Sequence, residues 1–243
     1  MILIGSLFNA MAIGLGFSIN LYFSTFYWEL SSSQIALFTF SSLASAVLAF
    51  AAAPRISQKF GKKRSAMVLI LTGFALGVVP IVLRLLGAFP PNGSPVIFPT
   101  LFVFNTLGTG LAIAGNILFS SMIADVVEDS ELRTGRRQEG LFFAAAAFVA
   151  KAVTGMGIFV SGTMLAFIHF PEGAKPGQVD PEIIRGLGLV YVPTQAVLYG
   201  LAVLFLTGYT ITRAGHEESL RKLAAAADLA AEGEPAGSTG KLS

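Results

Sequence analysis

The side chain that most suggests chemistry is a lysine inside a long apolar segment. Lys151 lies in the run LFFAAAAFVAKAVTGMGIF, about ten residues after the run of charged residues that precedes it. If that segment crosses a bilayer, a charged ammonium there costs at least about 2.5 kcal/mol. No acid of the chain lies at comparable depth. Lys151 therefore either faces a water-filled cavity and contacts a ligand, or extends its long side chain to the nearer membrane surface.

Two other apolar segments carry asparagines with a regular spacing. Asn9 and Asn20 are eleven residues apart, and so are Asn105 and Asn116. Eleven residues make three turns of an α-helix, so each pair lies on one helix face. Such amides either hydrogen-bond to neighbouring helices or line a wet cavity. We expect Asn20, Asn105 and Asn116 to bind a small-molecule substrate together with Lys151.

Several kinds of site are excluded by residue content. The chain has no cysteine, and its two histidines, His169 and His216, are too far apart in sequence for a metal-ligand motif. The sequence contains no hydrolase triad. Its glycine-rich runs lie inside apolar segments and not after a strand, so they are not phosphate-binding loops. A net charge of +2 does not indicate a nucleic-acid partner. We therefore expect neither an enzyme nor a bound cofactor or metal.

The composition indicates the elements that position these side chains. Of the 243 residues, 54% are hydrophobic and only 12% charged, with a mean hydropathy of +0.73. Soluble domains contain about 25% charged residues, so most of this surface must face lipid. Six segments are long enough to cross a bilayer. They are residues 1–28, 35–53, 65–87, 96–123, 140–170 and 184–212.

The predicted fold is therefore all-α. Residues 1–212 form a bundle of six transmembrane helices, and residues 213–243 form a tail that is helical and then disordered. Twelve of the sixteen basic residues fall on one side of this arrangement, in the 54–64 loop, the 124–139 loop and the tail. The positive-inside rule places that side and both termini in the cytoplasm. We expect the bundle itself to lie in the inner (plasma) membrane.

The 124–139 segment packs five acids and three arginines into sixteen residues. It is either a solvated loop or a network of ion pairs that closes the cytoplasmic mouth. For the second alternative, we expect Asp125 and Asp129 to form a cytoplasmic gate with Arg55 and Arg133.

Three segments are similar to one transporter family. SSMIADVVEDSELRTGRRQEGLFFAAAAFVAKAVTGMG resembles the glycoside–pentoside–hexuronide:cation symporters, the melibiose-permease-like branch of the major facilitator superfamily. RISQKFGKKR resembles that family's loop between helices eight and nine, and GYTITRAGHEESLRKL resembles its C-terminal signature. The resemblance implies that residues 1–212 correspond to helices seven to twelve of a twelve-helix fold. It also implies that Lys151 is the helix-eleven lysine near the substrate and cation sites.

At three positions this sequence differs from the residues that the family's sugar transporters use to recognise sugar. Asn116 stands where sugar transporters of this branch place a tryptophan, and Ala146 and Ala147 stand where they place Gln and Thr. The family's ligands for the coupling cation, Na⁺ or H⁺, belong to the N-terminal half. Met1 opens directly onto an apolar segment. We therefore expect the chain to need a preceding six-helix half or a second copy as its partner, within membrane lipid.

The sequence predicts the C-terminal half of a secondary transporter, similar to sugar/cation symporters, that moves a small solute by alternating access. Three alternatives remain open. The chain is a six-helix carrier or pore that homodimerises, a lysolipid carrier, or a membrane scaffold that does not transport.

Overall fold

The computed structural model describes residues 2–134 and 139–208; within these, the side chains of residues 126–134 and of several positions between 139 and 154 lie outside the description. The described chain is helical and contains no strand, which confirms the all-α prediction. Its helices are α1 (Ile2–Tyr22), continued by the π-helical turn η1 (Phe23–Tyr27), α2 (Ser32–Phe60), α3 (Lys62–Leu85), α4 (Ile97–Thr134), α5 (Glu139–Phe167) and α6 (Pro181–Thr207).

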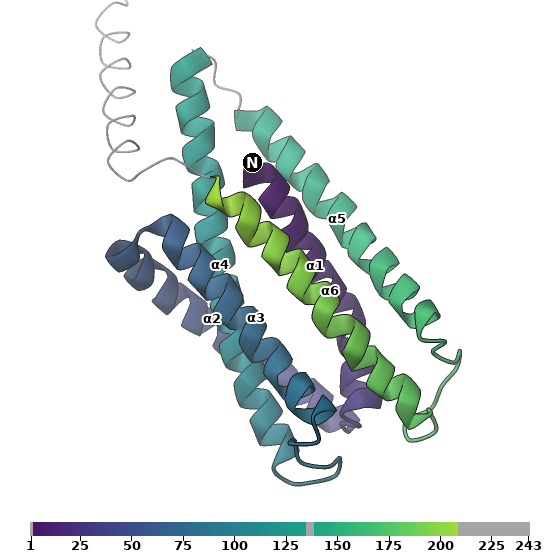
Figure 1. Cartoon of the computed structure of the whole chain (residues 1–243). Coiled ribbons are helices and arrows are strands. Elements are labelled where there is room, and N and C mark those ends of the chain that lie inside the picture. The colour runs from purple at the N-terminus through teal and green to yellow at the C-terminus, as the bar shows by residue number, and fades with distance from the viewer. Residues whose placement is uncertain (1, 135–138, 209–243) are drawn as a thin grey trace, which may run out of the picture.

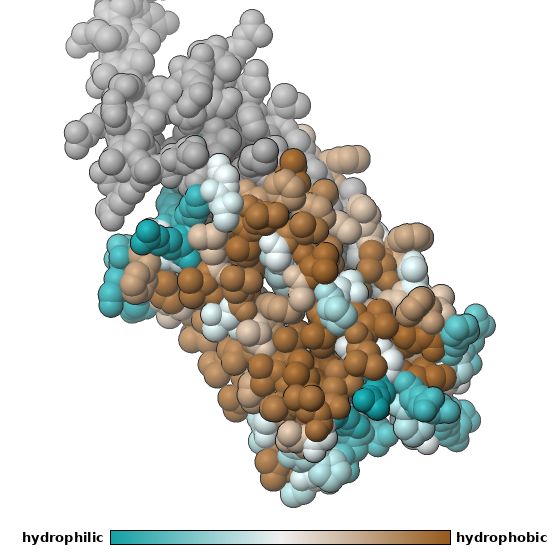
Figure 2. All heavy atoms as spheres, in the orientation of Figure 1, coloured by the Kyte–Doolittle hydropathy of each residue, from teal (hydrophilic) through white to brown (hydrophobic). Residues whose placement is uncertain are grey.

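Most of these helices are long and apolar enough to cross a membrane. Among the described residues, α1 with η1, α2, α3, α4 and α6 each contain such a span, and α5 contributes the shorter apolar stretch Gly155–Phe167. Large apolar side chains point outward, including Phe17 at 86% exposure. Figure 2 shows a broad hydrophobic belt between hydrophilic ends. Such a belt is stable only in lipid, so the chain is a polytopic membrane protein.

The helices pack in two groups of three, or triplets. Each triplet combines one helix from one half of the chain with two helices from the other half, an arrangement that we call exchanged packing. The first helix of the chain, α1, packs against α5 and α6, whereas α4 packs against α2 and α3 (Figure 1). Contacts between α3 and α6 join the two groups, and α1 touches α4 only sparsely. The first helix of each run of three is thus held by the last two helices of the other run. No internal sequence repeat had indicated this relation.

Glycines allow the closest helix contacts. A Cβ atom on Gly157 of α5 would lie 2.5 Å from the carbonyl carbon of Gly14 in α1. In the other group, a Cβ on Gly73 of α3 would lie 2.8 Å from backbone atoms of Gly108 and Ala112 in α4. Because apolar surfaces gain little from associating in lipid, this close backbone packing supplies much of the attraction between helices.

The helices extend beyond the boundaries predicted from hydropathy. The predicted 54–64 loop is almost entirely helical, because α2 continues to Phe60 and α3 begins at Lys62. Only Gly61 separates them, with a φ of +80° that favours glycine. Likewise, α4 continues to Thr134 through most of the predicted 124–139 loop. Hydropathy marks where a helix leaves the bilayer, whereas charged residues continue a helix into water. The predicted helical tail lies outside the described residues.

The turn that continues α1 at its C-terminal end is anchored to α3. The guanidinium carbon of Arg84 lies 4.9 Å from the ring centroid of Tyr27 and 5.2 Å from that of Trp28. Arg84 also donates to the side chain of Asn92, whose amide donates to the Tyr27 carbonyl oxygen at 3.3 Å. Tyr27 and Trp28 are buried beneath this arginine. They are therefore part of the bundle core, not of a lipid-facing aromatic belt.

Candidate functional site

The structure pairs the two asparagines nearest the predicted cytoplasmic side. Asn9 Nδ2 of α1 donates to Asn116 Oδ1 of α4 at 2.6 Å, and Asn116 Nδ2 donates to the Ala112 carbonyl oxygen at 2.8 Å. Asn9 is buried and Asn116 is half-buried. In this conformation the Asn116 amide therefore takes part in a hydrogen bond between helices. Of the two roles expected for these asparagines, this is the one that holds neighbouring helices together.

Asn105 has a similar role between α2 and α4. Its Nδ2 donates to Ser41 Oγ at 2.9 Å, and Ser41 Oγ lies 2.8 Å from Thr106 Oγ1. Ser45 Oγ donates to the Thr106 carbonyl oxygen at 2.9 Å. These contacts form a short polar zipper along the buried face of α2. Asn105 is thus committed to helix packing and does not point a free amide at a ligand.

Lys151 and Asn20 retain free polar groups. Both side chains are exposed, and neither has a hydrogen bond or ion pair with any residue of the described part of the chain. They belong to neighbouring helices, since α5 packs on α1 at the Gly14–Gly157 crossing. Of the four predicted substrate residues, these two could engage a ligand without first breaking a bond.

Lys151 and Asn20 lie on opposite sides of that crossing. The helices α1 and α5 run in the same direction (Figure 1). Asn20 follows Gly14 by six residues, whereas Lys151 precedes Gly157 by six. At 1.5 Å per residue, the two positions are about 18 Å apart along the bundle. One monosaccharide cannot touch both. By the same measure Lys151 lies at about the level of Asn9.

An ion pair joins two helices at the predicted cytoplasmic end. Lys62 Nζ, in the first turn of α3, donates to both carboxylate oxygens of Asp125 in α4, at 2.7 and 2.8 Å. The Asp125 side chain is 7% exposed and that of Lys62 is 34% exposed. Next to it, Lys63 Nζ donates to the Thr207 carbonyl oxygen at the end of α6. The start of α3 therefore contacts the inner ends of both α4 and α6.

In this structure Asp125 contacts a different basic residue from the one expected. Arg55 does not reach Asp125; its Nη1 donates instead to the Ala51 carbonyl oxygen, 2.6 Å away in its own helix. Lys62 belongs to the same basic run, but Gly61 turns the chain so that Lys62 faces α4. The side chains of Asp129 and Arg133 lie outside the described residues, so their part in the gate stays a prediction.

Sequence reasoning missed one buried polar contact. Gln195 of α6 is 2% exposed, and its Nε2 donates to the Ala12 carbonyl oxygen at 3.0 Å and to the Tyr191 hydroxyl at 3.2 Å. Within the described chain, neither Gln195 Oε1 nor Asn9 Oδ1 has a hydrogen-bond partner. A single glutamine in the apolar run 184–212 was the available signal for this contact between α1 and α6.

A shallow apolar groove lies between the outer parts of α2 and α4. It is lined by Leu37, Phe40, Phe98, Pro99, Phe102 and Val103. It lies in the triplet that does not contain Lys151 and offers no charged group. We therefore do not place a polar substrate there.

The described helices form a membrane-embedded bundle with an exposed lysine on α5 and an ion pair between α3 and α4. The chain belongs to the MFS/sugar transport protein family, whose model matches residues 1–213. This is a transporter family and not an enzyme family, and the predicted resemblance to sugar/cation symporters of the major facilitator superfamily is confirmed.

Named relatives support the same family. An uncharacterized symporter from Synechocystis sp. is 34% identical over 139 residues, which cover 55% of this chain and 24% of the relative. A putative glycoside/cation symporter from Escherichia coli is 31% identical over 123 residues, covering 51% of this chain and 25% of the relative. An isoprimeverose transporter from Lactiplantibacillus pentosus is 26% identical over 196 residues, covering 80% and 38%.

These matches span well under half the length of each of those three relatives. No solved structure gives a significant match to the chain.

Proposed function

We propose that the chain is the C-terminal half of a secondary transporter of the sugar/cation symporter type, which moves a small solute by alternating access. The observation that carries this proposal is Lys151, which is exposed and unpaired within the described residues at a depth where a charge is costly. The names of the relatives favour a glycoside or sugar as the solute. The departures at Asn116, Ala146 and Ala147 favour a ligand recognised mainly by the ammonium.

The partner proposed for this half is a preceding six-helix bundle or a second copy of the chain. It would cover the exposed face of α1 and α5 that carries Asn20 and Lys151, and so enclose them in a cavity. The coupling cation, Na⁺ or H⁺, would bind in that preceding half. Both termini would be cytoplasmic and the membrane would be the plasma membrane, as the distribution of basic residues indicates.

The cytoplasmic gate proposed here centres on Lys62 and Asp125. Their ion pair holds α3 against α4, and Asp129, Arg133 and Arg55 would add pairs across the mouth. Because such pairs form in one state and separate in the other, they would stabilise the outward-facing conformation.

A lysolipid carrier is the second candidate function. About 18 Å separates Lys151 from Asn20 along the bundle, and the Phe17 side chain between their levels is 86% exposed. An elongated amphiphile with an anionic or zwitterionic head would fit this spacing better than a monosaccharide.

Uptake by reconstituted protein that includes the partner half would test both candidates. The panel should contain sugars, glycosides and lysolipids, each with and without a Na⁺ or H⁺ gradient. We expect one class to be taken up by the wild type and lost in Lys151→Ala. If wild-type and Lys151→Ala protein transport nothing from the panel although both insert normally, the scaffold alternative is favoured.

A further inference from the structure

The corner between α2 and α3 carries two cations for which the described residues provide no acidic partner. Of the five basic residues between 54 and 64, Lys62 pairs with Asp125 and Lys63 binds the end of α6. Lys59 and Arg64, on either side of Gly61, are exposed and have no acidic partner among the described residues. Arg55 is exposed too, but its guanidinium is folded onto its own helix. Lys59 and Arg64 therefore remain available to an external anion.

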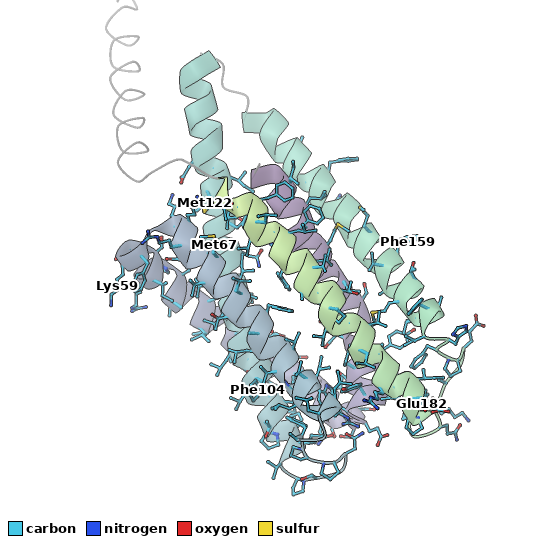
Figure 3. All side chains as sticks on the ribbon, in the orientation of Figure 1. Lys59, Met67, Phe104, Met122, Phe159 and Glu182 are labelled. Carbon is cyan, nitrogen blue, oxygen red and sulfur yellow. The ribbon has the colours of Figure 1, made fainter. Side chains whose placement is uncertain are left out.

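Aromatic and apolar groups continue from these two cations. Phe60 is 57% exposed, and Lys59 Nζ lies 5.2 Å from the centroid of its ring. Figure 3 shows Lys59 pointing away from the bundle at this corner. An exposed aromatic ring beside an ammonium is typical of the boundary between headgroups and hydrocarbon.

An exposed apolar stripe begins below Arg64. Val68 is 61% exposed and Leu71 is 41% exposed, one and two turns further into α3. Residues spaced by four and seven share one helix face, so this stripe descends from Arg64 into the bilayer. It could take an acyl chain whose headgroup lies at Arg64. Figure 2 shows the hydrophilic corner directly beside the hydrophobic belt.

We propose that Lys59 and Arg64, with Phe60 at the interface, bind the headgroup of an anionic phospholipid of the cytoplasmic leaflet. Charge complementarity favours this occupant, because basic clusters at the cytoplasmic end of a membrane helix attract anionic lipids. The Arg64 guanidinium can also hold a phosphate group with two parallel hydrogen bonds. Since Lys62 lies between Lys59 and Arg64, a lipid bound here would also stabilise the start of α3 that carries the gate ion pair.

The test is lipid binding by the purified full chain, and it does not depend on transport. Native mass spectrometry would follow titration with phosphatidylglycerol, and with phosphatidylcholine as the neutral comparison. The Lys59→Gln/Arg64→Gln variant should lose about thirty-fold in phosphatidylglycerol affinity, as two interfacial charges imply. The control Lys175→Gln/Arg185→Gln removes two exposed cations from the opposite end and should bind like the wild type.

A second measurement needs no substitution. Phosphatidylglycerol binding by the wild type should weaken as salt rises from low to high concentration, because exposed charges are screened. The proposal is overturned if the double variant binds phosphatidylglycerol as the wild type does, if the control loses as much affinity, or if phosphatidylcholine binds equally well. Preferential binding to an acidic protein segment in place of the lipid would also overturn it.

Discussion

Lys62 Nζ lies within 2.8 Å of both carboxylate oxygens of Asp125, and this contact fastens the first turn of α3 to the inner part of α4. Because the Asp125 side chain is almost fully buried, removing Lys62 would leave a carboxylate without that partner in a poorly hydrated place. The pair is therefore the most direct place to perturb the proposed gate.

The first prediction concerns this pair. Asp125→Asn should lower stability by about 1–2 kcal/mol, less than for a fully buried pair because Lys62 is one-third exposed. It should also increase the rate at which a cysteine at Ser121 is modified from the cytoplasmic side. The swap Lys62→Asp/Asp125→Lys should recover part of both effects. If the labelling rate is unchanged in Asp125→Asn protein that folds normally, the Lys62–Asp125 pair is not part of the gate.

The second prediction concerns the Asn9–Asn116 bond. Asn116→Leu leaves the buried Asn9 amide without its partner and should destabilise the bundle by about 1–2 kcal/mol. The double variant Asn9→Leu/Asn116→Leu should be more stable than Asn116→Leu alone, because no unpaired amide remains. Thermal unfolding in detergent would measure the coupling. Additive losses in the double variant would show that the two side chains act independently.

The third prediction uses two neighbouring glycines with different surroundings. Gly157→Ala places a Cβ 2.5 Å from Gly14 and should push α5 away from α1, at a cost of about 1–3 kcal/mol. Gly155→Ala is the matched control, because no atom lies within 4 Å of its added Cβ. That control should be neutral or slightly stabilising. Equal melting temperatures for the two variants would argue against the close crossing of α1 and α5.

The fourth prediction concerns Lys151. In protein that includes the partner half, Lys151→Ala should abolish transport or uncouple it from the cation, with membrane insertion unchanged. Lys151→Arg should have much the same effect, because a planar guanidinium does not replace a compact ammonium. The exposed Lys175 provides the control, and Lys175→Ala should transport normally. Wild-type kinetics and ion dependence in Lys151→Ala would mean that the lysine is a tolerated charge.

The fifth prediction concerns topology. Single cysteines at Gln58 and Glu172, which are both exposed, should react with a membrane-impermeant reagent from opposite sides. Gln58 should be labelled only from the cytoplasm, as the distribution of basic residues requires. Labelling of both cysteines in intact cells would contradict the orientation.

The all-α fold and the order of the long apolar helices in the described residues could be predicted from the sequence, because apolar runs of bilayer length have few other uses. Helix ends could not, since charged residues such as Lys59 extend a helix into water as readily as they end a span. The packing of α1 against α5 and α6 could not be predicted from the sequence either, because the contact between α1 and α5 depends on the close approach of two backbones at Gly14 and Gly157. Neither glycine is distinctive within a glycine-rich chain.

The predicted site residues have different surroundings in the structure. Depth alone singled out Lys151, and the structure leaves that ammonium free of partners in the described region. Periodicity did not say which neighbour each amide meets: Asn105 contacts Ser41 of α2, whereas Asn116 contacts Asn9 of α1. In this structure Asp125 contacts Lys62, whereas Arg55 bonds to its own helix, and the glycine between α2 and α3 lies at the point that orients Lys62.

The exchanged packing of the helices has a consequence for how the protein is made. Among the described helices α1 leaves the ribosome before the others, but its main packing partners, α5 and α6, are synthesised after all the others. Until they insert, Asn9 can already meet Asn116 of α4, but the buried part of α1 at Ala12 lacks its contact with Gln195 of α6. Assembly of the α1 group must therefore wait until α5 and α6 have been made, whereas α2, α3 and α4 can associate earlier.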